Sequence, residues 1–110
     1  MATFTVGAVV LVPFPFSDLS QSKLLPAVVL ARVARDDFIL CQVTSRAYGD
    51  NYSIVLENAD FASGSLKVLS CARPEKLFTG NKDFIVRQVG MLKSAKIEEI
   101  LDAVIDLFQG

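Results

Sequence analysis

The chain has 110 residues, of which 52% are hydrophobic and 21% charged, and its formal net charge is −1. This length predicts one domain over residues 1–110. The chain contains no histidine, which excludes catalysis by Ser–His or Cys–His pairs and metal sites built on imidazole. The nearly balanced charge excludes a protein with a wholly basic surface, so any nucleic-acid site must be a local patch.

The two cysteines, Cys41 and Cys71, lie in apolar runs at a spacing that matches neither a zinc site nor a disulfide framework. We therefore expect buried free thiols and a reducing, cytoplasmic compartment. The first residues lack the basic region of a signal peptide, and the apolar runs are shorter than a membrane span requires, so we expect neither.

Short apolar runs rich in β-branched residues predict strands in the first half of the chain. We expect these strands at residues 8–12, 26–31, 38–45 and 52–56. Pro13 and Pro15 end the first run because proline cannot donate a ladder hydrogen bond. The polar residues 16–23 form a loop longer than a hairpin requires, and such loops often carry binding sites.

The second half continues with β structure and then changes its period. We expect an irregular stretch at residues 57–65 and strands at 65–72, 77–79 and 84–90, with a bend at Arg73 and Pro74. Apolar residues from Ile97 to Phe108 recur with the helical period, which predicts an amphipathic helix of about four turns with Ser94 as its N-cap. The fold class is thus mainly β (α+β), a strongly bent or closed antiparallel sheet with a C-terminal amphipathic α-helix.

Several sequence blocks resemble the PemK/MazF family of bacterial toxins. They lie in order and at the family's spacing, and no single block is decisive. The blocks are residues 7–19 (GAVVLVPFPFSDL), 22–30 (SKLLPAVVL), 41–46 (CQVTSR), 73–78 (RPEKLF) and the Val89–Gly90 step.

This resemblance implies a small SH3-like barrel that forms a homodimer and cuts single-stranded RNA without a metal or other cofactor. It also implies a cognate antitoxin that blocks the RNA groove, with operator DNA reached only through that antitoxin. The implied reaction is attack of the RNA's own 2′-hydroxyl on the adjacent phosphorus, which leaves a 2′,3′-cyclic phosphate and a 5′-hydroxyl. The protein then supplies orientation, charge stabilisation and proton transfer.

The resemblance also assigns roles to residues of the expected cleft between the second and third strands. Leu25 occupies the position of the family's catalytic arginine and cannot itself stabilise a phosphate, whereas Thr44 matches the family's supporting hydroxyl. Candidate RNA-binding residues are Gln21, Ser22, Lys23, Ser45 and Arg46. Phe14 and Phe16 could stack on a base, but core packing is the more common role for such residues.

Three interpretations of Leu25 stay open: a degenerate toxin, a detoxified copy, or a site in which Lys23 or Arg46 has replaced the guanidinium. Loss or strong reduction of activity is the favoured outcome, because lysine is a poorer bidentate clamp for phosphate. The alternative functions are a non-catalytic module that binds an antitoxin or nucleic acid on the same fold, and an unrelated SH3-like barrel used in protein assembly. The last would require Leu25 and Thr44 to lie far apart.

Overall fold

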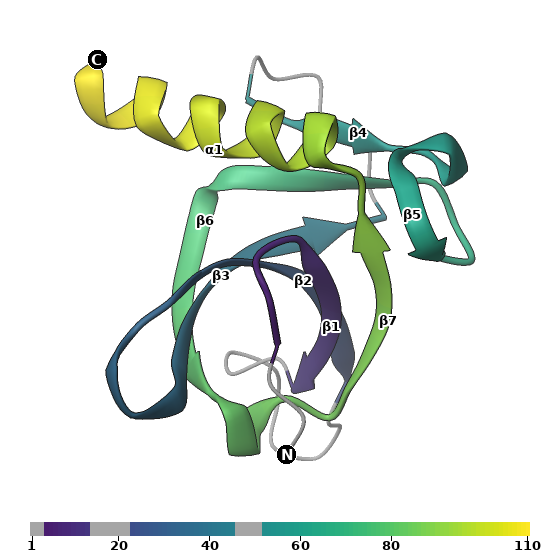
Figure 1. Cartoon of the computed structure of the whole chain (residues 1–110). Coiled ribbons are helices and arrows are strands. Elements are labelled where there is room, and N and C mark those ends of the chain that lie inside the picture. The colour runs from purple at the N-terminus through teal and green to yellow at the C-terminus, as the bar shows by residue number, and fades with distance from the viewer. Residues whose placement is uncertain (1–3, 14–22, 46–51) are drawn as a thin grey trace.

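The computed structural model describes residues 4–13, 23–45 and 52–110. In these ranges seven antiparallel strands form one strongly curled sheet in the order β4-β6-β3-β2-β1-β7-β5, with one α-helix after them (Figure 1). The strands are β1 (Ala8–Pro13), β2 (Leu24–Arg32), β3 (Asp37–Thr44), β4 (Ile54–Leu56), β5 (Phe61–Gly64), β6 (Ser70–Asn81) and β7 (Arg87–Leu92). The helix α1 covers Ser94–Gln109, and short 3-10 turns cover Ala34–Asp36, Asn58–Asp60 and Lys82–Phe84. The mainly β fold class with a C-terminal helix is confirmed.

The middle residues of β1, β2 and β3 are apolar on both faces because both faces of the curled sheet are covered there. Val9, Val28 and Cys41 belong to an apolar cluster beneath α1, whereas Val10 and Val29 belong to a second cluster on the other face. Alternate residues of a strand point to opposite faces, so a continuous apolar run is what two buried faces require.

Helix α1 lies across β6 and packs the first half of its apolar stripe onto the sheet (Figure 1). Ile100 is completely buried there, and Gly7 lets the chain pass under the helix, since a Cβ at Gly7 would overlap the δ1 carbon of Ile97. The far end of the stripe is uncovered: Ile105 is 50% exposed and Phe108 is 80% exposed. The sheet therefore accommodates only part of the apolar face that the sequence predicts.

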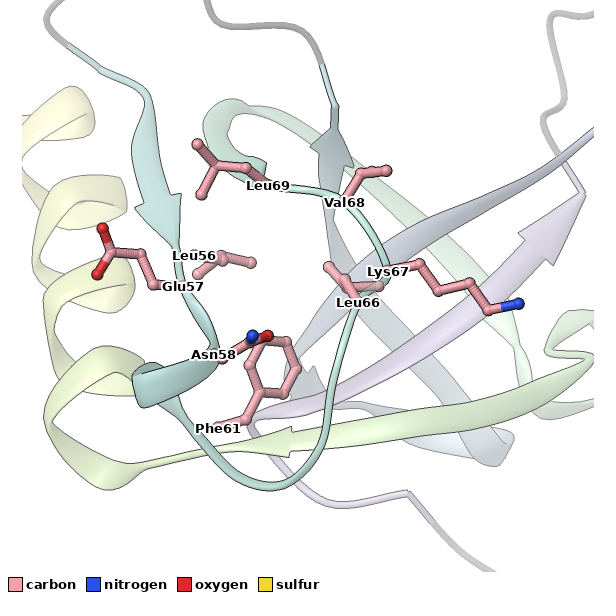
Figure 2. A pocket seen from close by; sticks show the side chains of 8 residues that line it. All are labelled: Leu56, Glu57, Asn58, Phe61, Leu66, Lys67, Val68 and Leu69. Carbon is pink, nitrogen blue, oxygen red and sulfur yellow. The ribbon is translucent and has the colours of Figure 1, made fainter.

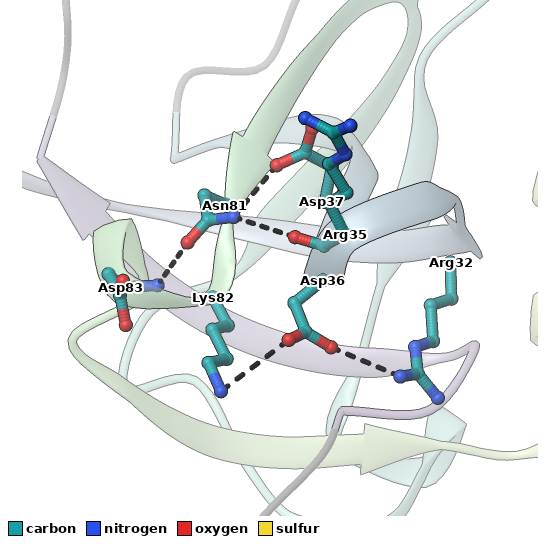
Figure 3. Close-up of polar contacts among 7 residues, drawn as sticks. All are labelled: Arg32, Arg35, Asp36, Asp37, Asn81, Lys82 and Asp83. Carbon is teal, nitrogen blue, oxygen red and sulfur yellow. Dashed lines mark hydrogen bonds and ion pairs between the residues drawn. The ribbon is translucent and has the colours of Figure 1, made fainter.

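The turn between β2 and β3 is held by polar contacts at the end of the sheet opposite to the start of β2 (Figure 3). Arg35 and Asp36 both have a φ of 62°, which is unfavourable for residues with a side chain. The amide of Asn81 donates to the carbonyl oxygen of Arg35 at 3.1 Å, and the Asp36 carboxylate pairs with Arg32 at 3.0 Å and Lys82 at 3.5 Å. These contacts compensate for the backbone strain and anchor β2 against β3 and β6.

Three predictions of the sequence were wrong in detail. The stretch at 57–65 contains a real strand, β5, which pairs with β7. Residues 70–81 form a single strand, β6, although its register against β3 shifts between Cys41 and Val43, next to the bend expected at Pro74. Lys93, not Ser94, is the N-cap of α1, and no side-chain hydrogen bond caps the helix there.

The expectation of buried free thiols is confirmed, since Cys41 and Cys71 are both buried and unpaired. Of the helices in the described ranges, none has the length and apolar character needed to cross a bilayer.

Candidate functional site

A cleft of about 470 Å³ opens where the end of β3 meets the start of β2. Three elements supply its walls: the first residues of β2, the last residues of β3, and the connection between β5 and β6. The described residues around it are Lys23, Leu24, Leu25, Pro26, Gln42, Val43, Thr44, Ser45, Leu66, Lys67, Val68 and Ser70.

The strand register explains why Leu25 and Thr44 meet. Ala27 pairs with Gln42 in the antiparallel ladder between β2 and β3. Continued by two residues toward the start of β2 and the end of β3, this register places Leu25 opposite Thr44. Residues two apart on a strand share a face, so Leu25, Gln42 and Thr44 all point toward the same side of the sheet. The structure thus brings positions 25 and 44 into one cleft, which an unrelated barrel would have no reason to do.

The side chains of this cleft differ in exposure. Leu25 and Thr44 are half-buried, and Lys23, Leu24 and Ser45 are exposed. The cleft therefore has an accessible rim and a more enclosed floor near the two strand ends.

The charged side chains described around this cleft are all basic. Lys23 and Lys67 both line it, and no carboxylate does among the described residues around it. The hydroxyl-bearing residues Thr44 and Ser45 add polar groups to its walls. Ammonium and hydroxyl groups without a competing carboxylate suit an anionic ligand with several oxygen acceptors, such as the phosphates of a nucleic acid.

Some predicted residues fall outside the part of the chain that the structure describes. These are Gln21, Ser22 and Arg46, together with the aromatic candidates Phe14 and Phe16. Of the predicted site residues, the described ones are Lys23, Leu25, Thr44 and Ser45, and all four line the same cleft.

The sequence did not predict the part of the cleft wall that comes from the connection between β5 and β6 and the start of β6, namely Leu66, Lys67, Val68 and Ser70. They belong to a stretch more than 20 residues after Thr44, and nothing local marks them as part of the same site. Gln42 did carry a signal, because it alternates with Thr44 on the polar face of its strand. The others could be found only from the tertiary fold.

A second hollow, of about 320 Å³, lies on the other side of the connection between β5 and β6. Figure 2 shows Phe61 and Leu66 pointing into this hollow, while the ammonium group of Lys67 points away from it. Leu66, Lys67 and Val68 line both this hollow and the cationic cleft, so the connection borders the two.

The described part of the chain offers neither a cluster of metal-ligating side chains nor an ionised thiol at Cys41. No group of three or more His, Cys, Asp and Glu side chains is placed there to hold a metal ion. Burial raises the pKa of the Cys41 thiol to about 12, and a backbone hydrogen bond at Arg73 opposes only part of that rise. Cys41 is therefore protonated at neutral pH, and the thiolate needed for nucleophilic attack is absent.

Comparisons with known proteins agree with this geometry. The chain is similar to MazF from Deinococcus radiodurans, with 20% identity over 100% of both chains and a TM-score of 0.78. It is also similar to a MazE–MazF structure from the same organism, with 18% identity over 98% of both chains and a TM-score of 0.78. The Mycobacterium tuberculosis toxin MazF-mt6 shares 15% identity and a TM-score of 0.72, over 93% of this chain and 96% of its own.

At these identities the structural matches show a shared fold. No curated protein sequence matches the chain. The sequence profile of the PemK-like, MazF-like toxins of type II toxin–antitoxin systems matches residues 5–108, which is nearly the whole chain. The chain therefore belongs to this family of type II toxins, whose members are endoribonucleases.

Proposed function

We propose that this chain binds single-stranded RNA in the cleft between β2 and β3 and cuts it without a metal. The nucleophile is the RNA's own 2′-hydroxyl, so the protein needs only to orient the chain, stabilise phosphate charge and move protons. The observation that carries this proposal is the convergence of Leu25 and Thr44 on one cleft that holds two lysines and no carboxylate among its described residues.

Each cleft residue has a proposed task in this reaction. The Thr44 hydroxyl hydrogen-bonds a phosphate oxygen or relays a proton, and Lys23 and Ser45 hold the RNA backbone on either side. Gln21, Ser22 and Arg46 are proposed to extend this contact. Leu25 contributes no charge, so the native chain lacks the guanidinium that its family uses at this position.

The leucine favours a second candidate function, a non-catalytic module that binds an antitoxin or nucleic acid on the same fold. Removing one donor that stabilises transition-state charge typically costs about 100- to 1,000-fold in rate. A chain with such a loss could retain its binding partners while cutting RNA slowly or not at all.

We further propose a cognate antitoxin as partner, since a MazE–MazF structure is among the similar structures. Contact with operator DNA would pass through that antitoxin. A homodimer is supported by the uncovered end of α1, where Ile105 and Phe108 are exposed and an apolar surface of this kind often marks an interface. The two free thiols favour the cytoplasm, where cysteines stay reduced.

The test is incubation of long RNA with the purified chain and with its Leu25→Arg variant, in the presence of EDTA. Cleavage should leave 2′,3′-cyclic phosphate and 5′-hydroxyl ends in both samples, and the variant should be faster. Absence of cleavage by both forms would refute the nuclease proposal. RNA binding by both forms without cleavage would instead support the non-catalytic module.

A further inference from the structure

We propose that Lys67 is a substrate-contacting cation of this site and supplies, opposite Leu25, part of the positive charge that the missing guanidinium would give to an RNA phosphate. This inference rests on the proposed RNA-binding function and adds to it a residue from a third element of the fold. Lys67 lines the same cleft as Leu25 and Thr44 although it lies 42 residues after Leu25 in the chain.

The direction of the side chain supports this assignment. In Figure 2 the neighbouring Leu66 points into the hollow of about 320 Å³ described above. The Lys67 side chain extends the opposite way, with its ammonium group clear of that hollow. Leu66 also packs against the apolar cluster beneath α1. Leu66, Lys67 and Val68 border both the hollow and the cleft, and the Lys67 ammonium group lies on the side of this segment that faces away from the hollow.

The backbone around Lys67 is anchored on both sides. Before it, Gly64 adopts a φ of +67° and lies so close to β7 that a Cβ there would overlap the carbonyl oxygen of Val89. After it, Ser70 is 2% exposed and its hydroxyl donates to the carbonyl oxygen of Val68 at 2.9 Å. A lysine on an anchored segment loses less freedom when it binds phosphate, which strengthens the contact.

The charge of Lys67 is not used elsewhere in the described structure. The ion pairs there use Arg32, Arg73, Lys82 and Lys96, and none involves Lys67 or Lys23. An exposed ammonium group without a carboxylate partner remains available to a polyanion. Lysine binds phosphate as a point charge and does not need the planar approach of a guanidinium.

The experiment measures binding of a short random-sequence 2′-O-methyl RNA, which cannot be cut because its 2′-oxygen is blocked. Affinity is determined over a range of salt concentrations for the native chain and for Lys67→Ala, Lys67→Arg and Lys76→Ala. Lys76 is the matched control, since it is also an exposed lysine without an ion pair among the described residues, and it does not line the cleft. Thermal unfolding of each variant checks that the fold is unchanged.

Lys67→Ala should weaken binding by roughly 10- to 100-fold, the range expected for losing a hydrogen bond to a charged group. It should also lower the slope of log affinity against log salt by about 0.7, the value for one phosphate contact on a single strand. Lys67→Arg should restore both quantities, and Lys76→Ala should change neither. A purely structural role for Lys67 would alter stability but not the salt slope.

The failures of the two proposals are distinguishable. If the native chain binds and cuts RNA and Lys67→Ala behaves like Lys76→Ala, the role of Lys67 is refuted and the proposed function stands. If RNA is bound but neither the native chain nor Leu25→Arg cuts it, the nuclease proposal falls, and the salt slopes still decide the role of Lys67. If neither the native chain nor Leu25→Arg binds or cuts RNA, the proposed function falls, and the role of Lys67 falls with it.

Discussion

Replacing Leu25 by arginine is the change that most directly tests the chemistry of this cleft. Leu25 is half-buried opposite Thr44, so an arginine there can keep its methylene groups against the sheet and its guanidinium in the cleft. A donor that stabilises transition-state charge is worth about 100- to 1,000-fold in rate. We therefore expect Leu25→Arg to cut RNA faster than the native chain by a factor in that range.

The same substitution should cost stability in the absence of RNA. Two like charges about 4 Å apart in water repel by about 1 kcal/mol, and a larger separation lowers this value. The arginine in the same cleft as Lys23 and Lys67 should therefore lower the free energy of unfolding by at most about 1 kcal/mol per lysine. Added salt or RNA should remove this penalty, since both screen or neutralise the repulsion. Urea denaturation with and without RNA measures the effect.

The assay is single-turnover cleavage of a labelled RNA in EDTA, with Val33→Arg as the control. Val33 follows the far end of β2 and is 40% exposed, so this variant adds the same charge outside the cleft. Adding Thr44→Val to Leu25→Arg should then slow cleavage by about tenfold or more, the cost of a hydrogen bond to a charged group. Equal rates for Leu25→Arg, Val33→Arg and the native chain would refute the assignment of position 25.

Three further predictions concern the fold and its surfaces. Ile100→Ala should lower the free energy of unfolding by about 2–5 kcal/mol, because it leaves a cavity at a buried site. Ile105→Ala, at a half-exposed site, should lower it by under about 1 kcal/mol. Urea denaturation gives both free energies, provided that the two variants have the same m-value. A pKa of about 12 instead of 9.0 lowers the thiolate fraction of Cys41 at pH 8 about a thousandfold, so iodoacetamide should label Cys41 only after unfolding. The raised pKa also predicts that the Cys41 contribution to the free energy of unfolding is fully present below pH 9 and is lost between pH 9 and 12, because the unfolded thiol ionises in that range before the folded one; urea denaturation of the native chain and Cys41→Ala over this range measures it. Phe108→Ser should shift a homodimer toward monomer in sedimentation velocity without loss of helix content, and unchanged association would contradict an interface at the end of α1.

Local patterns in the sequence were sufficient for most of the secondary structure. The β-branched runs at 8–12 and 26–31 correspond to β1 and β2, and the apolar period after Ile97 corresponds to α1. These elements are predictable because side-chain periodicity reflects which faces are buried. The absence of histidine and the uncharged leucine at position 25 were equally visible, since they depend only on residue identity.

Elements whose formation depends on distant partners were not predictable in the same way. The short strand β5 (Phe61–Gly64) pairs with β7, and Gly64 is required there by close contact with the β7 backbone, not by any local turn. The N-cap was misplaced by one residue because no side-chain hydrogen bond marks it. For β5, a tertiary contact outweighed the local preference.

The candidate site also has features that the sequence predicts and features that only the tertiary structure shows. The sequence by itself determined which groups the chain can offer: hydroxyls at Thr44 and Ser45, ammonium groups, no imidazole, and an uncharged leucine at position 25. Only the tertiary structure decided which of these groups share a cleft, because the ladder between β2 and β3 places Leu25 opposite Thr44 and the anchored segment before β6 brings Lys67 beside them. The physical reason is that residue chemistry is a local property, whereas the meeting of segments far apart in the chain depends on strand register and on the burial of side chains such as Leu66.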